Sequence, residues 1–160
     1  STRLNSKQKM RMTLLRSPSD PDPTADRGEH LFTYSLMPHP GTWRDAATVN
    51  RAYELNAPPV AWLSDKEPAY TGVLLGLEAS NLVIDTIKKA EKEDAIVIRI
   101  YESWGVDVEA KLDTAFKIAK ATECDLLERD LQTLEHGESS LLLSFKPFEI
   151  KTVKLVPCKS

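Results

Sequence analysis

Polar and apolar residues alternate in short runs along most of the chain, a period of two that predicts β-strands with one buried face. The clearest run covers residues 106–112, where apolar side chains alternate with charged ones. Similar runs predict strands at 9–14, 32–36, 73–77, 82–87, 96–101, 116–121, 141–145 and 148–155. Short strands at this spacing, without helices between them, favour an antiparallel β-sandwich.

Two of these predicted strands are joined by a short turn that contains glycine. Residues 96–101 and 106–112 flank Ser103, Trp104 and Gly105. A connection of this kind is typical of an antiparallel β-hairpin. We therefore expect these two strands to pair with each other.

One stretch, about residues 42–55, has the pattern of an α-helix. Thr42 is a candidate N-cap, with Asp45 at the acidic position of a capping box. Trp43 and Tyr53 share one helical stripe and are expected to pack in the core, and Pro58-Pro59 ends the helix. The predicted fold class is mainly β, with antiparallel β-sandwiches and this one short helix.

The polar stretch Ser64–Pro68 is the best internal boundary, so the sequence predicts two domains, residues 1–64 and 65–160. Ahead of it, three prolines within residues 18–23 predict an extended loop. The stretch Glu91–Asp94 is predicted to be a solvated loop.

The charge balance argues against two classes of partner. The chain has 21 Lys and Arg against 24 Asp and Glu, a net charge of −3. A basic excess that could neutralise nucleic acid or an anionic membrane surface is absent, so neither is expected as a partner. No apolar run approaches the ~20 residues that cross a bilayer.

The N-terminus and the cysteines suggest a processed or excised intracellular chain. The sequence starts at Ser1 without an initiator methionine, which we interpret as a sign of processing or of a fragment. Cys124 and Cys158 are too few for a disulfide scaffold and are expected to be reduced thiols.

The residue patterns predict neither a metal site nor a catalytic group. His30, His39 and His136 lie in separate contexts without ligand spacing. The acidic repeat that starts at Asp20 resembles a calcium loop but has Ala25 where the turn requires glycine, so we interpret it as a proline-braced surface loop. Nucleophile-elbow, P-loop and dinucleotide motifs are absent.

The polar cluster Asp26–His30 is the one loop with candidate chemistry. Arg27 offers a planar fork of donors to a carboxylate or a sugar hydroxyl. The alternative is a surface arginine that pairs with a nearby acid, which contributes little to stability.

Several segments in order resemble a known family. They are residues 10–18, 21–23, 25–30 and 32–39, followed near the C-terminus by 124–129 and 145–152. Together they resemble the C-terminal β region of glycoside hydrolase family 38, the retaining α-mannosidases, and they look closest to the shorter cytosolic or bacterial-type members.

This resemblance implies an accessory domain. In the family, a zinc ion held by His and Asp residues and a nucleophilic Asp lie in an N-terminal α/β barrel, and no position of this chain matches them. The expected parent enzyme hydrolyses terminal α-mannosyl linkages in glycans, with its zinc in the absent barrel and no cofactor in this segment. Residues 1–64 would then be the trailing part of a large β-sandwich that includes the helix, and 65–160 a small terminal sandwich.

The resemblance also implies partners, a compartment and one site. The expected partners are the N-terminal barrel and, through the parent enzyme, a mannose-containing glycan, with homo-oligomer formation left open and a cytoplasmic location. Catalytic residues are not expected here. Arg27 is the candidate that faces the sugar pocket, and Asp26 and Gly28 form its supporting loop.

Two other functions remain open. A free-standing carbohydrate-binding module could stack Trp43, Trp62 or Trp104 on sugar faces, and only Trp104, in a turn, is expected to be exposed. The third alternative is a structural or oligomerisation domain.

Overall fold

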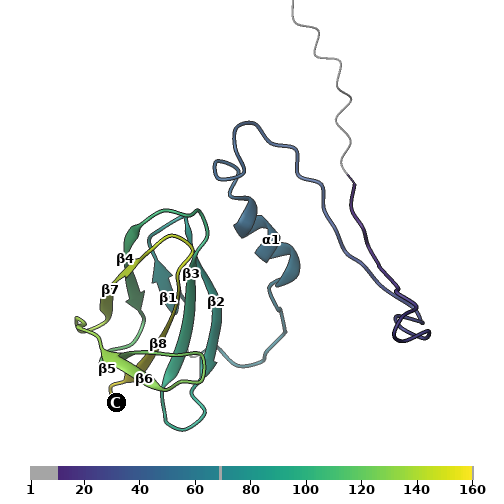
Figure 1. Cartoon of the computed structure of the whole chain (residues 1–160). Helices are drawn as coiled ribbons and strands as arrows, with labels where there is room; N and C mark the ends of the chain where they lie inside the picture. The colour runs from purple at the N-terminus through teal and green to yellow at the C-terminus, as the bar shows by residue number, and fades with distance from the viewer. Residues whose placement is uncertain (1–10, 69, 160) are drawn as a thin grey trace, which may run out of the picture. The chain divides into compact units, whose positions relative to one another are not determined.

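The computed structural model describes residues 11–68 and 70–159, which contain one helix and eight strands. The chain separates into two units, Ser1–Pro38 and His39–Ser160, and both the helix and the strands belong to the second (Figure 1). The elements are α1 (Thr48–Asn56), β1 (Leu75–Leu77), β2 (Leu82–Lys89), β3 (Ile96–Glu102), β4 (Val108–Thr114), β5 (Ile118–Cys124), β6 (Asp130–Thr133), β7 (Ser140–Phe145) and β8 (Ile150–Pro157).

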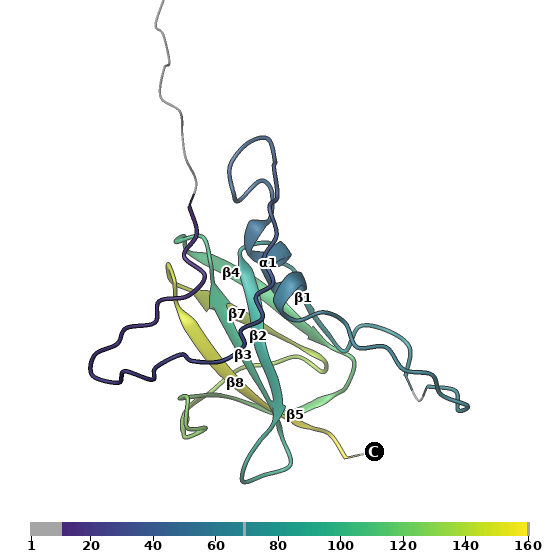
Figure 2. The same ribbon diagram turned by 90° about the vertical axis from the view of Figure 1, so that its right-hand side faces the viewer.

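The strands form two antiparallel sheets, which confirms the predicted β-sandwich. The smaller sheet has the order β1-β4-β7 and the larger one β2-β3-β8-β5-β6. Figures 1 and 2 show the smaller sheet lying against one face of the larger. The core lies between the sheets, because Ile98 and Ile100 of β3, Leu112 of β4 and Leu155 of β8 belong to one cluster of fully buried side chains.

Alternation predicted most strands to within a few residues, because each strand buries only one of its faces. In β4, Ala110 and Leu112 are buried while Glu109 and Lys111 are exposed. β6 was missed, since its four residues are all exposed and carry no apolar alternation. The stretch 91–94 is an exposed loop, as predicted.

The predicted hairpin between 96–101 and 106–112 is wrong. β3 pairs with β2 and β8, whereas β4 pairs with β1 and β7 in the other sheet. The connection Ser103–Asp107 is therefore a corner between sheets. The amides of Trp104, Gly105 and Val106 donate to the Glu102 carboxylate rather than to a neighbouring strand, an arrangement that spacing alone does not reveal.

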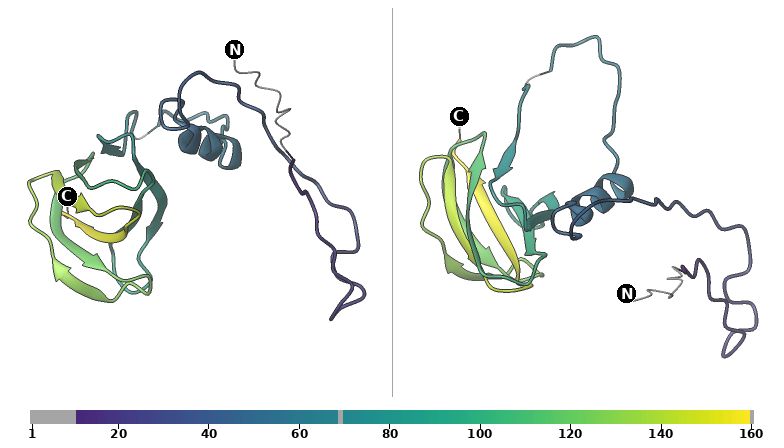
Figure 3. Two further views of the ribbon diagram at one scale, coloured as in Figure 1. Left: turned by 45° about the horizontal axis from the view of Figure 1, so that its top comes forward. Right: turned by 90° about the horizontal axis from the view of Figure 1, so that it is seen from above.

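The strands predicted at 9–14 and 32–36 are also absent from the described part of these segments. Residues 11–14 and 32–36 are exposed and form no ladder, and Figure 3 draws them as a plain trace without arrows; Lys9 and Met10 lie outside the described residues. An extended segment becomes a strand only when a neighbour pairs with its backbone. None of the described segments pairs with either one.

The helix starts six residues later than predicted. The capping box does form, because the Asp45 carboxylate accepts hydrogen bonds from the Thr42 amide and hydroxyl, both at 2.7 Å. It closes only a turn, however, since Ala47 adopts a left-handed conformation with φ of 50°. The α-helix begins at Thr48 and has no buried residue.

The expected core packing of the helix aromatics is therefore wrong for Trp43, whose exposed fraction is 42%. Tyr53 is half-buried and anchors α1 to the larger sheet. Its hydroxyl donates to Asp85 Oδ1 at 2.8 Å, and its ring lies 6.4 Å from that of Tyr101. A β-bulge of β2 between Ile84 and Thr86 accompanies this contact.

Candidate functional site

The predicted sugar-facing loop, Asp26–Gly28, lies in the unit Ser1–Pro38 and is shaped by local hydrogen bonds. Asp22 Oδ1 accepts from the amide and the hydroxyl of Thr24, and the Arg27 amide donates to the Thr24 carbonyl at 3.3 Å. His30 Nε2 lies 2.8 Å from the Asp26 carbonyl. The loop is a self-supported turn of exposed residues.

The backbone of this loop explains its glycine. Asp26 has φ of 56° and Gly28 has φ of 135°, a region that residues with a side chain rarely adopt. A Cβ on Gly28 would meet no atom within 4 Å, so backbone conformation rather than space selects the glycine. Arg27 is exposed, and its side chain makes no hydrogen bond or ion pair with the described residues.

The exposure of the three tryptophans is the reverse of the expected order. Trp62 is 78% exposed and Trp43 42%, whereas Trp104 is half-buried in the corner between the sheets. Trp104 is held there because its amide donates to Glu102 and its carbonyl accepts from Arg44 at 2.5 Å. The sequence misplaced Trp104 because a buried carboxylate beneath a turn leaves no periodic signal.

Glu102 is the most buried charged group of this corner, with an exposed fraction of 1%. Five N–H donors converge on its carboxylate, from the side chain of Asn81 and from the amides of Trp104, Gly105, Val106 and Phe148. Burial by itself raises the pKa of Glu102, but these hydrogen bonds outweigh it and hold the pKa at about 2. Glu102 is therefore an ionised carboxylate with a structural role, because it binds together the segments that meet at this corner.

A second buried charge lies on the outer face of the larger sheet. Lys154 of β8, whose side chain is 6% exposed, pairs with Asp130 at 2.6 Å and with Glu93. Asp130 above all, and then Glu93, raise the pKa of Lys154. These contacts tie the 90–94 loop and the start of β6 to the central strand.

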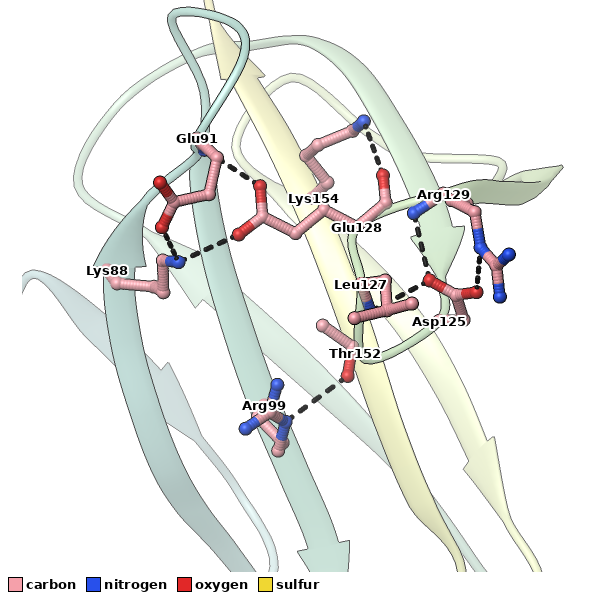
Figure 4. A network of polar contacts seen from close by, with 9 residues as sticks. All are labelled: Lys88, Glu91, Arg99, Asp125, Leu127, Glu128, Arg129, Thr152 and Lys154. Carbon is pink, nitrogen blue, oxygen red and sulfur yellow. Dashed lines mark hydrogen bonds and ion pairs between the residues drawn. The ribbon is translucent and has the colours of Figure 1, made fainter.

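Glu128 completes this network from the adjoining loop (Figure 4). Its carboxylate accepts from Lys88 at 2.9 Å and from the Glu91 amide at 2.8 Å, and these contacts lower the pKa of Glu128. Asp125 closes the same loop by accepting from the Leu127 and Arg129 amides at 2.9 Å each. The segment 124–129, which resembles the family, therefore consists of the last residue of β5 and a loop that hydrogen bonds hold to the 88–91 region of the larger sheet.

The network borders a cavity of about 240 Å³. The ionisable groups of the network have a structural role rather than a catalytic one. Wherever the pKa of a carboxyl group is shifted in the described residues, it is lowered, as at Asp85, Asp125 and Asp130. A glycosidase general acid needs a raised pKa. These groups are thus suited to pairing with cations rather than to protonating a leaving group.

The residues present do not fit a zinc ion. Within residues 11–68 and 70–159, no three or more His, Cys, Asp and Glu side chains gather in a way that could hold a metal. One ring nitrogen of each of His30, His39 and His136 lies within 3.1 Å of a backbone carbonyl close by in the chain. In the same described part, no helix is both long and apolar enough to cross a membrane.

Comparison with known proteins identifies the sandwich. Residues 81–153, from the start of β2 into β8, match the family described as glycosyl hydrolases family 38 C-terminal beta sandwich domain. This segment is thus similar to the C-terminal β-sandwich domain of family 38. The matched segment contains the buried Glu102 and the Glu128 loop, while α1 and the Asp26–Gly28 loop lie outside the match.

Similarity to curated proteins extends beyond the family 38 domain. The chain is 38% identical to alpha-mannosidase 2C1 of Mus musculus and 37% identical to that of Homo sapiens, each over 151 residues. It is 33% identical to alpha-mannosidase G of Dictyostelium discoideum over 154 residues. Each alignment covers 91% of this chain but 14% of the relative, so the chain spans about one seventh of their length.

Proposed function

We propose that this chain is the C-terminal accessory part of a zinc-dependent, retaining α-mannosidase that hydrolyses terminal α-mannosyl linkages in glycans. The observation that carries the proposal is the family 38 domain at residues 81–153, together with relatives named alpha-mannosidase that align over 91% of the chain. The catalytic barrel and its zinc lie elsewhere in the complete polypeptide, and that barrel is the partner of this segment.

The segment by itself has no hydrolase activity in this proposal. The described carboxyl groups with shifted pKa values are ionised and paired, which supports a structural role. The test is hydrolysis of an aryl α-mannoside by the purified chain and by the complete polypeptide that contains it. Turnover by the purified chain with stoichiometric zinc would overturn the inactivity, and a complete polypeptide that is inactive with zinc would overturn the enzyme assignment.

Residues 1–64 belong to a larger β-sandwich in this proposal. Phe32, Tyr34 and Leu36 support it, because they alternate along an extended segment and are 42–71% exposed. Such a segment is suited to join a sheet that another part of the polypeptide provides. Amide exchange in 32–36 that is slow in the complete polypeptide and fast in the isolated chain would support this pairing.

Arg27 approaches the mannose-binding pocket of the complete enzyme, supported by Asp26 and Gly28. The support is its exposed guanidinium on a turn whose backbone is held by its own hydrogen bonds. Arg27→Ala in the complete enzyme should lower kcat/KM about tenfold or more, the loss of one charged hydrogen bond. Arg16→Ala, a second exposed arginine of the same unit, is the control, and an unchanged kcat/KM for Arg27→Ala would refute the role.

The enzyme acts in the cytoplasm in this proposal, with free cysteines that suit a reducing compartment. Cys124 is buried and Cys158 exposed, and neither is in a disulfide. Fractionation of cells with an antibody against the chain tests the location. Recovery from a secretory compartment would contradict it.

A carbohydrate-binding module is the second candidate, because Trp62 and Trp43 are exposed and available for stacking. Calorimetry of the isolated chain with mannose oligosaccharides distinguishes the two functions. Heat of binding at millimolar ligand that Trp62→Ala abolishes would favour the module over the accessory domain.

A further inference from the structure

A short apolar segment between the helix and the sandwich is exposed to solvent. It consists of Val60, Ala61, Trp62 and Leu63, here called the apolar segment. The exposed fractions are 81% for Val60, 78% for Trp62 and 103% for Leu63. The segment lies outside every helix and strand, between Pro58-Pro59 and Pro68.

This composition is unusual for a loop that faces only water. Loops of this kind are normally polar, and single exposed apolar residues are common, but a contiguous run with a tryptophan marks an interaction surface. Tryptophan is among the residues that contribute most to binding energy at interfaces. The flanking prolines restrict the backbone, so less conformational entropy is lost when the segment binds.

Inside this chain one surface could compete for the apolar segment. An open groove of about 480 Å³ is bordered by Leu74, Ile87, Ile96 and Pro157, and Ile87 is 52% exposed. The segment does not occupy it, since its side chains are exposed.

The length of the relatives indicates what the apolar segment binds. They are about seven times as long as the aligned region, and the alignments cover 91% of this chain. In proteins of that length the apolar segment has a large additional surface available. We infer that residues 60–63 dock as an extended strap into an apolar groove on the part of a longer α-mannosidase polypeptide that lies outside this chain.

This inference rests on the proposed function and adds a specific contact to it. Trp62 is the anchor of the strap, and its indole N–H requires a carbonyl or carboxylate acceptor within an otherwise apolar groove. Val60 and Leu63 flank the anchor on the same extended segment.

The experiment compares Trp62→Ser with Trp43→Ser, a matched control that removes another exposed indole of the same unit. Both variants are made in the isolated 160-residue chain and in the complete polypeptide. We measure the thermal midpoint of each protein and the rate at which a protease cleaves residues 57–68. In the complete polypeptide, Trp62→Ser should raise that cleavage rate about tenfold or more, and Trp43→Ser should not. In the isolated chain, both variants should leave the midpoint unchanged.

Other occupants give different results, each of which overturns the inference. If Ile87→Asp and Trp62→Ser both lower the midpoint of the isolated chain, the strap occupies its own groove. If light scattering shows that the isolated chain is a dimer and that Trp62→Ser makes it a monomer, the strap binds a second copy of the chain. Equal cleavage of wild type and Trp62→Ser in the complete polypeptide leaves the strap without a partner. Because cleavage rather than turnover is measured, a failure of the α-mannosidase assignment would be recognised separately by absent activity.

Discussion

At the scale of single residues, Glu102 joins three separate segments of the chain through its carboxylate. It is the last residue of β3, and the chain leaves the larger sheet immediately after it. Its carboxylate gathers donors from three segments, around Asn81, Trp104 and Phe148. A buried carboxylate with five donors replaces the backbone pairing that the corner lacks.

Glu102→Gln should destabilise the sandwich by about 2–4 kcal/mol, because the amide NH₂ would face N–H donors that the carboxylate accepts. Chemical denaturation monitored by circular dichroism measures the loss. Glu109→Gln, which changes an exposed carboxylate on β4, is the control. A loss of unfolding free energy no larger than that of the control would contradict this structural role of Glu102.

The same group predicts an acid dependence with a definite sign. Its pKa is about 2 in the folded chain against an ordinary 4.5, so the folded state favours the ionised form. The corresponding stability, on the order of 3 kcal/mol, is present above about pH 5 and is lost as the pH falls from 4.5 towards 2. The difference in unfolding free energy between wild type and Glu102→Gln should therefore shrink over that range, and a constant difference would refute the assignment.

Gly105 is the glycine whose replacement should disturb this corner. It has φ of 74°, and a Cβ there would lie 2.6 Å from the Phe148 ring. Gly105→Ala should cost about 1–3 kcal/mol through backbone strain and the clash. Gly76→Ala on β1, where the nearest atom would be 3.8 Å away, is the control that should change little. Equal urea midpoints for both variants would contradict this account.

At the scale of elements, α1 and the sandwich differ in how they are held. The strands share a buried core, whereas α1 has no buried residue and contacts the larger sheet through the side chain of Tyr53. The neighbouring Tyr101, burial and the Asp85 carboxylate raise the pKa of Tyr53, so its hydroxyl remains a donor at neutral pH. An element without a buried residue should open more easily than the sheets.

Tyr53→Phe isolates that contact, because it removes only the hydroxyl that donates to Asp85 at 2.8 Å. Loss of one hydrogen bond, about 1 kcal/mol, should accelerate amide exchange in α1 about fivefold and leave exchange in β3 and β8 unchanged. Tyr34→Phe, an exposed tyrosine of the other unit, is the control. Hydrogen exchange with mass spectrometry reads both regions, and unchanged exchange in α1 would show that the contact does not hold the helix.

At the scale of the whole molecule, stability resides in the sandwich. Every side chain of the main buried cluster lies between Leu82 and Leu155, a range that largely coincides with the family 38 match. Residues 11–38 contribute no side chain to that cluster. The described part of the chain thus combines an independently cored domain with segments that carry exposed apolar side chains.

Deletion of residues 1–38 should therefore leave the thermal midpoint of the sandwich within about 2 °C of that of the 160-residue chain, because the described residues 11–38 have no buried side chain. Near-ultraviolet circular dichroism follows the melting of the aromatic side chains that remain. As a comparison, Leu112→Ala in β4 should cost about 2–5 kcal/mol, since Leu112 is fully buried. If the deletion lowers the midpoint as much as Leu112→Ala does, the conclusion that stability resides in the sandwich is wrong.

Local chemistry made much of the fold predictable, and part of the candidate site. A strand that buries one face has an apolar residue at every second position, so strands such as β4 were located from residues such as Ala110 and Leu112. The turn-forming residues of the Asp26–Gly28 loop were also recognisable. The role of Arg27 stays a prediction, because the order of residues along the chain does not tell which surface an exposed side chain faces.

The sequence by itself determined the fold class, most strand positions, the existence of one helix and the resemblance to family 38, because all four are recorded in local order along the chain. Only the tertiary structure decided that β3 and β4 lie in different sheets, that Trp104 is half-buried while Trp62 is exposed, and that α1 begins at Thr48. Strand pairing and burial depend on which distant segment supplies the partner. Here a single carboxylate, Glu102, collects donors from segments up to 46 residues away in the chain.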